Sequence, residues 1–246
     1  MQAIILLGGK GTRLRGLYPD RPKALAPIAG RPFLQWQLEW LARHGICEAH
    51  LAAGHLAGAI RDWVASTALK SKITVSVEPQ PLGTGGGLKF TKEFIRTDPF
   101  LILNGDSLLP NLDFQALMAA GVKPDALITL AVTRIESAGR YGTVEFDALN
   151  RVTAFREKAA RTGGWINGGV YLARRALLTG IKPGKLVSLE TDVFPALCAA
   201  GRVAAFPSEP PLLDMGTPDG MQAMERYLRD PATPNSATPN SVTHLA

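Results

Sequence analysis

The sequence predicts an α/β fold: a mostly parallel, mixed sheet with helices on both faces and a small antiparallel elaboration in the second half. In the first half, short apolar runs alternate with amphipathic stretches, which is typical of a parallel sheet covered by helices on both sides. After Tyr141, strand-like runs follow one another without long helices between them. A hydrophobic content of 46% in 246 residues is enough to bury the core of one large domain.

The elements of the first half follow from the period of the apolar residues. Short apolar runs predict strands at residues 3–7, 48–53, 73–78, 100–103 and 126–132. Helical spacing predicts helices at residues 33–44, 56–65, 85–95 and 114–120. Pro32 stands where a first helical turn tolerates proline, and Gly45 stands where a helix is expected to end.

The second half contains the strand-like runs YGTVEFD, VTAFREK and GGVYLARR. We interpret it as a substrate-facing extension of one domain that spans residues 1–230. Ser188 is predicted to cap a short helix. Residues 231–246 read PATPNSATPNSVTHLA, without apolar periodicity, and are expected to form a disordered tail.

Charge and cysteine content limit the possible functions. The net charge of +6 favours acidic partners, but there is no dense Lys/Arg block and only 7% of residues are aromatic. We therefore expect an anionic small molecule rather than nucleic acid as the partner. Cys47 and Cys198 are too few for a disulfide framework and fit a reducing cytoplasm. No apolar run is long enough to predict a membrane span.

A glycine-rich turn follows the first predicted strand in the segment LLGGKGTRLR. Glycines at positions 8, 9 and 11 allow the backbone to approach a ligand closely and to point N–H groups at phosphate oxygens. Arg13 follows the turn, and Lys23 lies in the proline-flanked segment RPKALAP. Because ligands of open α/β sheets bind beyond the carboxyl ends of the strands, this arrangement predicts a triphosphate site.

Two familiar phosphate loops do not match this turn. A Walker A loop requires glycine where Ile4 stands and serine or threonine where Gly11 stands. The dinucleotide pattern G-x-G-x-x-G requires glycine where Leu14 stands. Taken alone, the turn could also be an ordinary surface turn of a basic protein.

The segments GGKGTRLR and PKALAPIAGRPF resemble the signature of sugar-1-phosphate nucleotidyltransferases. The resemblance implies a Rossmann-like fold, a glycine-rich loop that binds the nucleotide, and basic residues that contact its phosphates. The nucleotide-binding residues would be Leu7, Gly8, Gly9, Gly11 and Thr12, and the catalytic residues Arg13 and Lys23. Leu7 stands where many members of the family have alanine.

A second glycine-rich segment, PLGTGGG, is predicted at a loop-to-helix junction. A flat base could lie there and hydrogen-bond to the backbone, although a plain junction would have the same pattern. The family resemblance places this segment at the nucleobase. The residues expected there are Gln80, Gly83, Thr84, Gly85 and Gly86, with Glu78 as a further candidate for reading the base edge.

Two aspartates far apart in the sequence stand at the ends of apolar runs. Asp106 follows FLILNG, and Asp214 follows LL in LLDMGTPDG. Mg²⁺ prefers oxygen ligands and is typically held by one or two carboxylates together with phosphates and water. Each aspartate alone is compatible with an ordinary turn. The family resemblance implies that both hold one Mg²⁺ ion.

The sugar side of the site is predicted from the resemblance of WINGGVY to the family's sugar-facing segment. Lys158 would bind the sugar phosphate as a third catalytic residue, although it could also be a solvated strand end. Glu190 could accept sugar hydroxyls or favour the positive end of a helix. The expected sugar-binding residues are Asn104, Gly105, Glu157, Asn167, Gly168 and Glu190.

These motifs occur in family order and imply an enzyme that makes an NDP-sugar and pyrophosphate from an NTP and a sugar 1-phosphate. The segments PKALAPIAGRPFL, PLGTGGGLK and SLETDVFP are most similar to guanylyltransferases that act on D-glycero-α-D-manno-heptose 1-phosphate, which implies GTP. Uridylyltransferases of glucose, N-acetylglucosamine or N-acetylmuramic acid 1-phosphates are the close alternative. A non-catalytic nucleotide-sugar-binding regulatory subunit and a nucleic-acid-binding protein are the alternatives from other classes. The resemblance allows a cytoplasmic homodimer.

Overall fold

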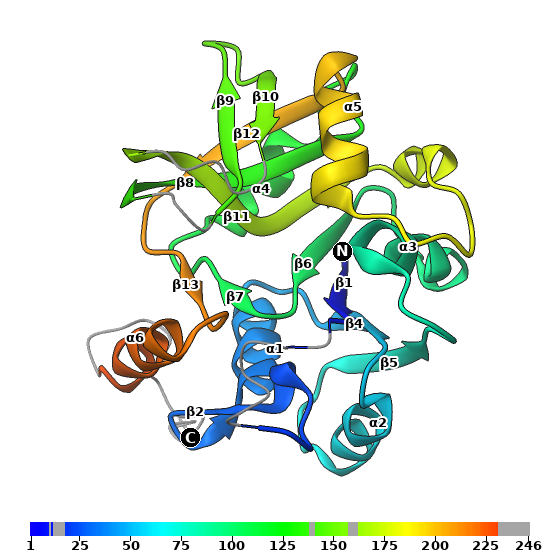
Figure 1. The fold of residues 1–246 in the computed structure, drawn as a ribbon, viewed down its shortest axis with the longest axis vertical. Coiled ribbons are helices and arrows are strands. Elements are labelled where there is room, and N and C mark those ends of the chain that lie inside the picture. The colour runs from blue at the N-terminus through cyan, green and yellow to red at the C-terminus, as the bar shows by residue number, and fades with distance from the viewer. Residues whose placement is uncertain (10, 12–17, 138–140, 157–161, 231–246) are drawn as a thin grey trace, which may run out of the picture.

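The computed structural model describes residues 1–9, 11, 18–137, 141–156 and 162–230. These residues form a nine-stranded sheet in the order β10-β9-β11-β6-β1-β4-β5, with β8 beside β11 and β12 beside β8 (Figure 1). Its strands are β1 (Gln2–Leu7), β4 (Glu48–Ala53), β5 (Lys72–Val77), β6 (Phe100–Asn104), β8 (Ile128–Ser137), β9 (Thr143–Phe146), β10 (Val152–Arg156), β11 (Thr162–Ala173) and β12 (Val203–Ser208). Two short ribbons accompany it: β2 (Pro27–Ile28) with β3 (Arg31–Pro32), and β7 (Ser107–Leu108) with β13 (Leu213–Asp214).

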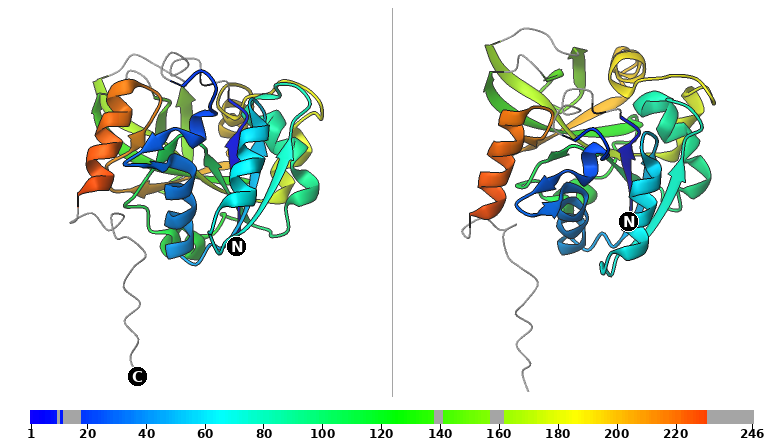
Figure 2. Two further views of the ribbon diagram at one scale, coloured as in Figure 1. Left: turned by 90° about the horizontal axis from the view of Figure 1, so that it is seen from below. Right: turned by 60° about the horizontal axis from the view of Figure 1, so that its bottom comes forward.

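Helices cover both faces of the sheet (Figure 2). Ala3, Ile5 and Leu7 of β1 are buried in one cluster with residues of α1, α2, α4 and α6, whereas Ile4 is buried in a second cluster with residues of α3 and α5. Side chains of a strand alternate between the two faces, so burial on both sides explains the continuous apolar run. The helices are α1 (Phe33–Arg43), α2 (Ala57–Ser66), α3 (Gly83–Phe90), α4 (Phe114–Ala120), α5 (Phe194–Ala199) and α6 (Pro218–Arg229). The predicted fold is confirmed.

In the parallel half of the sheet, the carboxyl ends of β1, β4 and β6 lie at the same edge. β1 runs parallel to β4 on one side and to β6 on the other, and β5 is parallel to β4. Leu6 pairs with Asn104, and Leu7 pairs with Ala53. The loops that follow β1, β4 and β6 therefore leave the sheet together.

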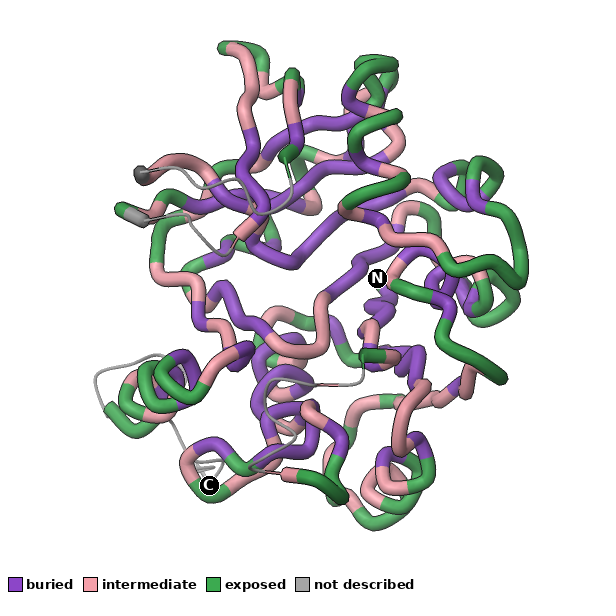
Figure 3. Tube along the Cα trace, in the orientation of Figure 1, coloured by how far each residue is buried: buried purple, intermediate pink, exposed green. Residues whose placement is uncertain are grey.

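The antiparallel elaboration belongs to the same sheet. The long strand β11 pairs antiparallel with β6, β8 and β9, and β10 extends the sheet from β9. In the β11–β8 ladder the register shifts between Asn167 and Tyr171. Buried residues run along these central strands, and exposed residues lie mainly on the outer helices and loops (Figure 3).

Several expected boundaries are shifted by one or two residues in the structure. Three differences concern the ends of α3, α1 and β8. The helix expected at 85–95 is α3, which ends at Phe90 and is followed by a separate 3₁₀ turn at Lys92–Phe94. Pro32 precedes α1 with an extended ψ of 137°, since it pairs within the β2–β3 ribbon. Strand β8 continues past the expected residue 132 because its ladder with β11 reaches residue 137.

Other boundaries agree with the sequence pattern. β4 and α4 have the expected limits, and Gly45 follows α1 with a φ of 77°. No helix in the described part of the chain is long and apolar enough to cross a membrane. The tail predicted at 231–246 lies outside the described residues, and the assignment of residues 1–230 to one domain stays a prediction.

Candidate active site

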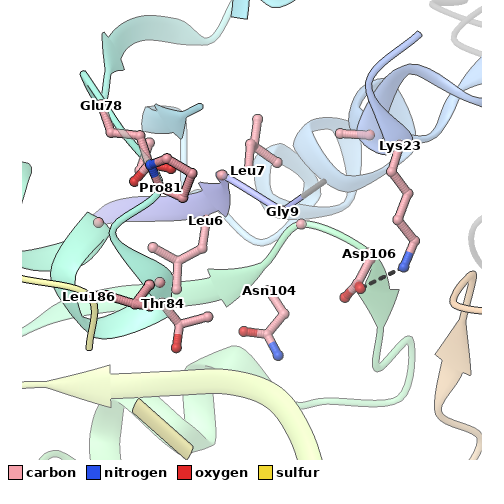
Figure 4. A pocket seen from close by; sticks show the side chains of 16 residues that line it. Leu6, Leu7, Gly9, Lys23, Glu78, Pro81, Thr84, Asn104, Asp106 and Leu186 are labelled. Carbon is pink, nitrogen blue, oxygen red and sulfur yellow. Dashed lines mark hydrogen bonds and ion pairs between the residues drawn. The ribbon is translucent and has the colours of Figure 1, made fainter. Parts of the chain in front are cut away.

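A pocket of about 400 Å³ lies at the carboxyl ends of β1 and β6. Its described lining comes from the first glycine turn, the segment around Lys23, the start of α3 and the loop after β6. Figure 4 shows Lys23 and Asp106 at one end of this pocket and Glu78 and Pro81 at the other. Small-molecule sites commonly have this size and position.

The turn after β6 brings the Asp106 carboxylate to the pocket. The Gly105 N–H donates to the Leu6 carbonyl at 3.1 Å, which ties this turn to the end of β1. A Cβ on Gly105 would overlap the Leu7 side chain and lie 2.6 Å from the Leu6 carbonyl oxygen. Glycine is therefore required for the close approach between the two loops.

The backbone segments that carry the two candidate metal-binding aspartates lie side by side. Asp214 of β13 pairs with Ser107 of β7, and the Met215 N–H donates to the Asp106 carbonyl at 3.0 Å. The Asp214 Oδ1 accepts a hydrogen bond from the Gly216 N–H at 2.7 Å. The structure thus brings together the backbone segments that carry Asp106 and Asp214, which the sequence separates widely.

Lys23 is directed at the same place. Its Nζ lies 2.7 Å from Asp106 Oδ2, with side-chain exposures of 17% and 41% for the two partners. Pro22, in extended conformation, precedes the 3₁₀ turn Lys23–Leu25 and fixes where the lysine starts. Gly11, with a φ of 57°, lies against Lys23, because a Cβ there would be 3.3 Å from the lysine Cβ.

Four expected site residues cannot be placed relative to this pocket. They lie outside the described residues and are Thr12, Arg13, Glu157 and Lys158. Leu7, Gly8 and Gly9, by contrast, line the pocket as expected. Their contact with a nucleotide stays a prediction.

The backbone of the second glycine segment contacts the chain around Val187, and its expected role at the nucleobase stays a prediction. The N–H groups of Gly85 and Gly86 donate to the Val187 carbonyl at 2.9 and 3.1 Å. A Cβ on Gly83 would lie 2.5 Å from the same oxygen. These glycines allow the segment around Val187 to pack closely on α3, and the Gly85 and Gly86 N–H groups already have a partner other than a base.

The side chains of Thr84, which lines the pocket, and Glu190 contact each other. The Thr84 hydroxyl donates to Glu190 Oε2 at 2.7 Å and accepts from the Leu189 N–H at 2.8 Å. Ser188 donates to the same carboxylate oxygen at 2.8 Å. Ser188 also accepts from the Glu190 and Thr191 N–H groups, so its predicted role as a helix cap is confirmed at the π-helical turn Leu189–Val193.

Glu78 places a carboxyl group in the far end of the pocket. Burial raises its pKa, partly opposed by a hydrogen bond from the Leu82 N–H at 3.3 Å. A Cβ on Gly8 would lie 2.8 Å from Glu78 Oε1, and one on Gly54 would overlap that atom. Both glycines therefore make room for this carboxyl. Gln80 is exposed and is not among the residues that line the pocket, and its expected role at the base stays a prediction.

The expected sugar-binding segment of β11 lies beside Asn104. Asn167 accepts from the Gly169 N–H at 3.0 Å and donates to the Tyr171 hydroxyl at 2.8 Å. A Cβ on Gly169 would lie 3.2 Å from Asn104 Nδ2, and one on Gly168 would lie 2.9 Å from the Ala131 carbonyl oxygen. Asn104 itself lines the pocket, whereas Asn167, Gly168 and Glu190 are not among its lining residues.

The comparison with known proteins decides the family. Residues 2–230 match the model of the nucleotidyl transferase family. The chain belongs to this family. A D-glycero-α-D-manno-heptose 1-phosphate guanylyltransferase from Campylobacter jejuni is 41% identical over 172 residues, 70% of this chain and 75% of that protein. An enzyme of the same name from Aneurinibacillus thermoaerophilus is 34% identical over 231 residues, 93% of this chain and 99% of that protein.

A solved structure supports the assignment of the chain to this family. The crystal structure of HddC from Yersinia pseudotuberculosis complexed with GMP-PN has a TM-score of 0.80 at 29% identity. The match covers 92% of this chain and 98% of that chain. The fold is therefore shared over nearly the whole of both proteins.

The carboxylates of this nucleotidyl transferase fit a divalent metal ion of the Mg²⁺ type. The described residues contain no group of three or more His, Cys, Asp and Glu side chains that could hold a metal. Mg²⁺ does not require such a cluster, because one or two carboxylates and substrate phosphates usually suffice. Asp106, which directly precedes β7, and Asp214 of β13 would supply that set of ligands.

Several residues that line the pocket of the nucleotidyl transferase were not predicted from the sequence. Ala52 lies near the end of β4, and the parallel register could have predicted its position at the pocket edge. Gly87 and Leu186 also line the pocket. Leu186 is 74% exposed, and no local pattern indicates that an exposed leucine borders a site.

Proposed function

We propose that the protein transfers a guanylyl group from GTP to D-glycero-α-D-manno-heptose 1-phosphate and releases pyrophosphate. The observation that carries this proposal is one pocket with a Lys23–Asp106 pair at one end and the Glu78 carboxyl at the other. Membership of the nucleotidyl transferase family and the names of the two relatives support the substrates.

The reaction needs little acid–base chemistry from the protein. A phosphate oxygen of the sugar 1-phosphate attacks the α-phosphorus of GTP, and the bond from that phosphorus to the β-phosphate oxygen breaks. Pyrophosphate leaves with the bonding electrons. Because the attacking phosphate is already an anion at neutral pH, catalysis rests on alignment and on neutralisation of charge.

The end of the pocket near Asp106 supplies this neutralisation. Lys23, only 17% exposed at its side chain, places an ammonium group where the phosphates are expected. Asp106 and Asp214 would hold Mg²⁺, which supplies further positive charge to the phosphates when bound. Arg13 and Lys158 are proposed as the remaining cationic contacts.

The opposite end favours guanine over uracil. Guanine presents an N1–H and an N2 amino group side by side, and one ionised carboxylate can accept from both. Uracil presents a single N–H between two carbonyl oxygens, which an ionised Glu78 would repel. Glu78 is held in place by the Leu82 N–H and by the space that Gly8 and Gly54 leave. We therefore propose Glu78 as the group that selects GTP.

The experiment compares GTP, UTP, CTP and ATP for wild type and Glu78→Gln, with heptose, mannose and glucose 1-phosphates as acceptors. Pyrophosphate release is the readout. Loss of a charge-assisted hydrogen bond typically costs about 1.5–3 kcal/mol, so kcat/KM for GTP is expected to fall by roughly 10- to 150-fold. Glu93→Gln, at a side chain that is 85% exposed, is the matched control. A wild type that prefers UTP would support the uridylyltransferase alternative instead.

Location and assembly are part of the same proposal. We propose a cytoplasmic enzyme that acts as a homodimer, and analytical ultracentrifugation of the purified chain tests the second statement. A sedimentation coefficient of a monomer at micromolar concentration would contradict it.

A further inference from the structure

Gln37 is a polar side chain within the buried face of α1. It is 0% exposed and stands between Trp36 and Leu38, which are 4% and 1% exposed. Burying an amide without hydrogen bonds is unfavourable, and an apolar residue of similar size would fill this place at lower cost. The glutamine therefore calls for a specific reason.

The Gln37 amide contacts the loop that carries Asp106. Its Nε2 donates to the carbonyl oxygens of Asn104 at 2.8 Å and of Ser107 at 3.3 Å. These two residues flank Gly105 and Asp106, so one side-chain amide spans the whole turn. Because both partners are acceptors only, the nitrogen of the amide must face them.

The same loop is held from two further sides by backbone groups. The Gly105 N–H is bound to the Leu6 carbonyl, and the Asp106 carbonyl accepts from the Met215 N–H. The contact of Gln37 with the loop differs from these two because it comes from a side chain. The Oε1 atom of Gln37 is buried and has no hydrogen-bond partner in the described part of the chain. The amide oxygen of Gln37 thus makes no hydrogen bond there, while the amide nitrogen donates to the loop.

We propose that Gln37 is a positioning residue for the divalent-cation site. By tying both ends of the Asn104–Ser107 turn to α1, it fixes the Asp106 carboxylate relative to Asp214 and Lys23. Gln37 is fully buried and therefore acts through Asp106 rather than on a substrate. This inference rests on the proposed function, because it assumes that Asp106 receives a cation beside the nucleotide phosphates.

A purely structural role for Gln37 is the competing explanation, and the chain offers a matched control. Gln2 is also a buried glutamine, 1% exposed, whose Nε2 donates to the Phe94 carbonyl at 3.0 Å. It lies at the amino end of β1, whereas the pocket lies at the carboxyl end of that strand. Replacing either glutamine by methionine removes one buried amide and keeps a side chain of similar length.

The test compares Gln37→Met and Gln2→Met in the full chain by urea unfolding, steady-state kinetics and direct binding of Mn²⁺, measured by electron paramagnetic resonance. Both variants are expected to lose similar stability. Only Gln37→Met is expected to bind Mn²⁺ about tenfold more weakly, as for the loss of about one net hydrogen bond. Its kcat at fixed Mg²⁺ should fall, higher Mg²⁺ should restore it, and the KM for GTP should change less than twofold.

Equal Mn²⁺ affinity and equal Mg²⁺ dependence in the two variants would overturn the proposal, as would an active wild type that does not bind Mn²⁺. Gln37→Asn keeps the amide but shortens it by one methylene, and it replaces Gln37→Met if that variant does not fold. Gln37→Asn is also expected to weaken Mn²⁺ binding, but by a smaller factor than Gln37→Met. A wild type without nucleotidyltransferase activity that still shows the Gln37-dependent Mn²⁺ site would refute the proposed function and leave the positioning role intact.

Discussion

Acidification is expected to destabilise the protein through His50. This residue of β4 is fully buried, and its ring nitrogens lie 2.8 Å from Thr74 Oγ1 and 2.9 Å from Ser76 Oγ. Its ring stacks on Phe94 at a centroid distance of 4.3 Å. Burial, with a smaller contribution from Arg96, lowers the pKa of His50 from 6.5 to about 4.

The sign and size of the effect follow from this pKa. The unfolded chain binds a proton near pH 6.5, whereas the folded chain resists protonation of His50 until about pH 4. The contribution to stability is therefore fully present above pH 6.5 and is lost as the pH falls from 6.5 towards 4. At about 1.4 kcal/mol per pH unit, the loss from this residue amounts to about 3 kcal/mol.

The assay is urea unfolding, followed by tryptophan fluorescence, at several pH values between 7.5 and 4. Wild type and His50→Asn contain the same other titrating groups, so the difference between their free energies of unfolding isolates His50. Wild type should lose up to about 3 kcal/mol more than the variant over this range. Parallel pH profiles for the two proteins would refute the assignment of the lowered pKa to His50.

Three further predictions concern the active site and are read by pyrophosphate release. Lys23→Ala should leave urea unfolding nearly unchanged and lower kcat by at least about 100-fold, as for a lost group that stabilises transition-state charge. Asp106→Ala should lower kcat by a similar factor, and near wild-type turnover by either variant would contradict its role. Gly54→Ala should raise the KM for GTP about tenfold, because its Cβ would overlap Glu78 Oε1 and displace that carboxyl. Gly58→Ala, where a Cβ meets open space, is the matched control and should leave KM unchanged.

The parts of the fold that the sequence predicts well are those with a strong local period. The strand at 48–53 and the helix at 114–120 have the predicted limits because their apolar residues are bounded by turn-forming residues. Asp106 and Asp214 each follow an apolar run, and in the structure Asp214 pairs with Ser107, next to Asp106. Family resemblance supplied the pairing that spacing alone left open.

The parts that the sequence could not predict depend on contacts between distant segments. Gly85 and Gly86 resemble a ligand-binding loop locally, but the carbonyl of Val187, far along the chain, occupies their N–H groups. Gln37 lies within an apolar helix face, and only the folded structure reveals that it contacts the Asn104–Ser107 loop. Local patterns therefore located the site, whereas its supporting contacts required the structure.

Product analysis of a single reaction tests whether the protein transfers a guanylyl group to the sugar phosphate. Purified protein is incubated with GTP, D-glycero-α-D-manno-heptose 1-phosphate and Mg²⁺, and both products are quantified by chromatography and mass spectrometry. The account predicts the GDP-sugar and pyrophosphate in equal amounts, and no product after removal of divalent cations. Absence of a GDP-sugar, while UTP with a hexose 1-phosphate is turned over, would contradict it.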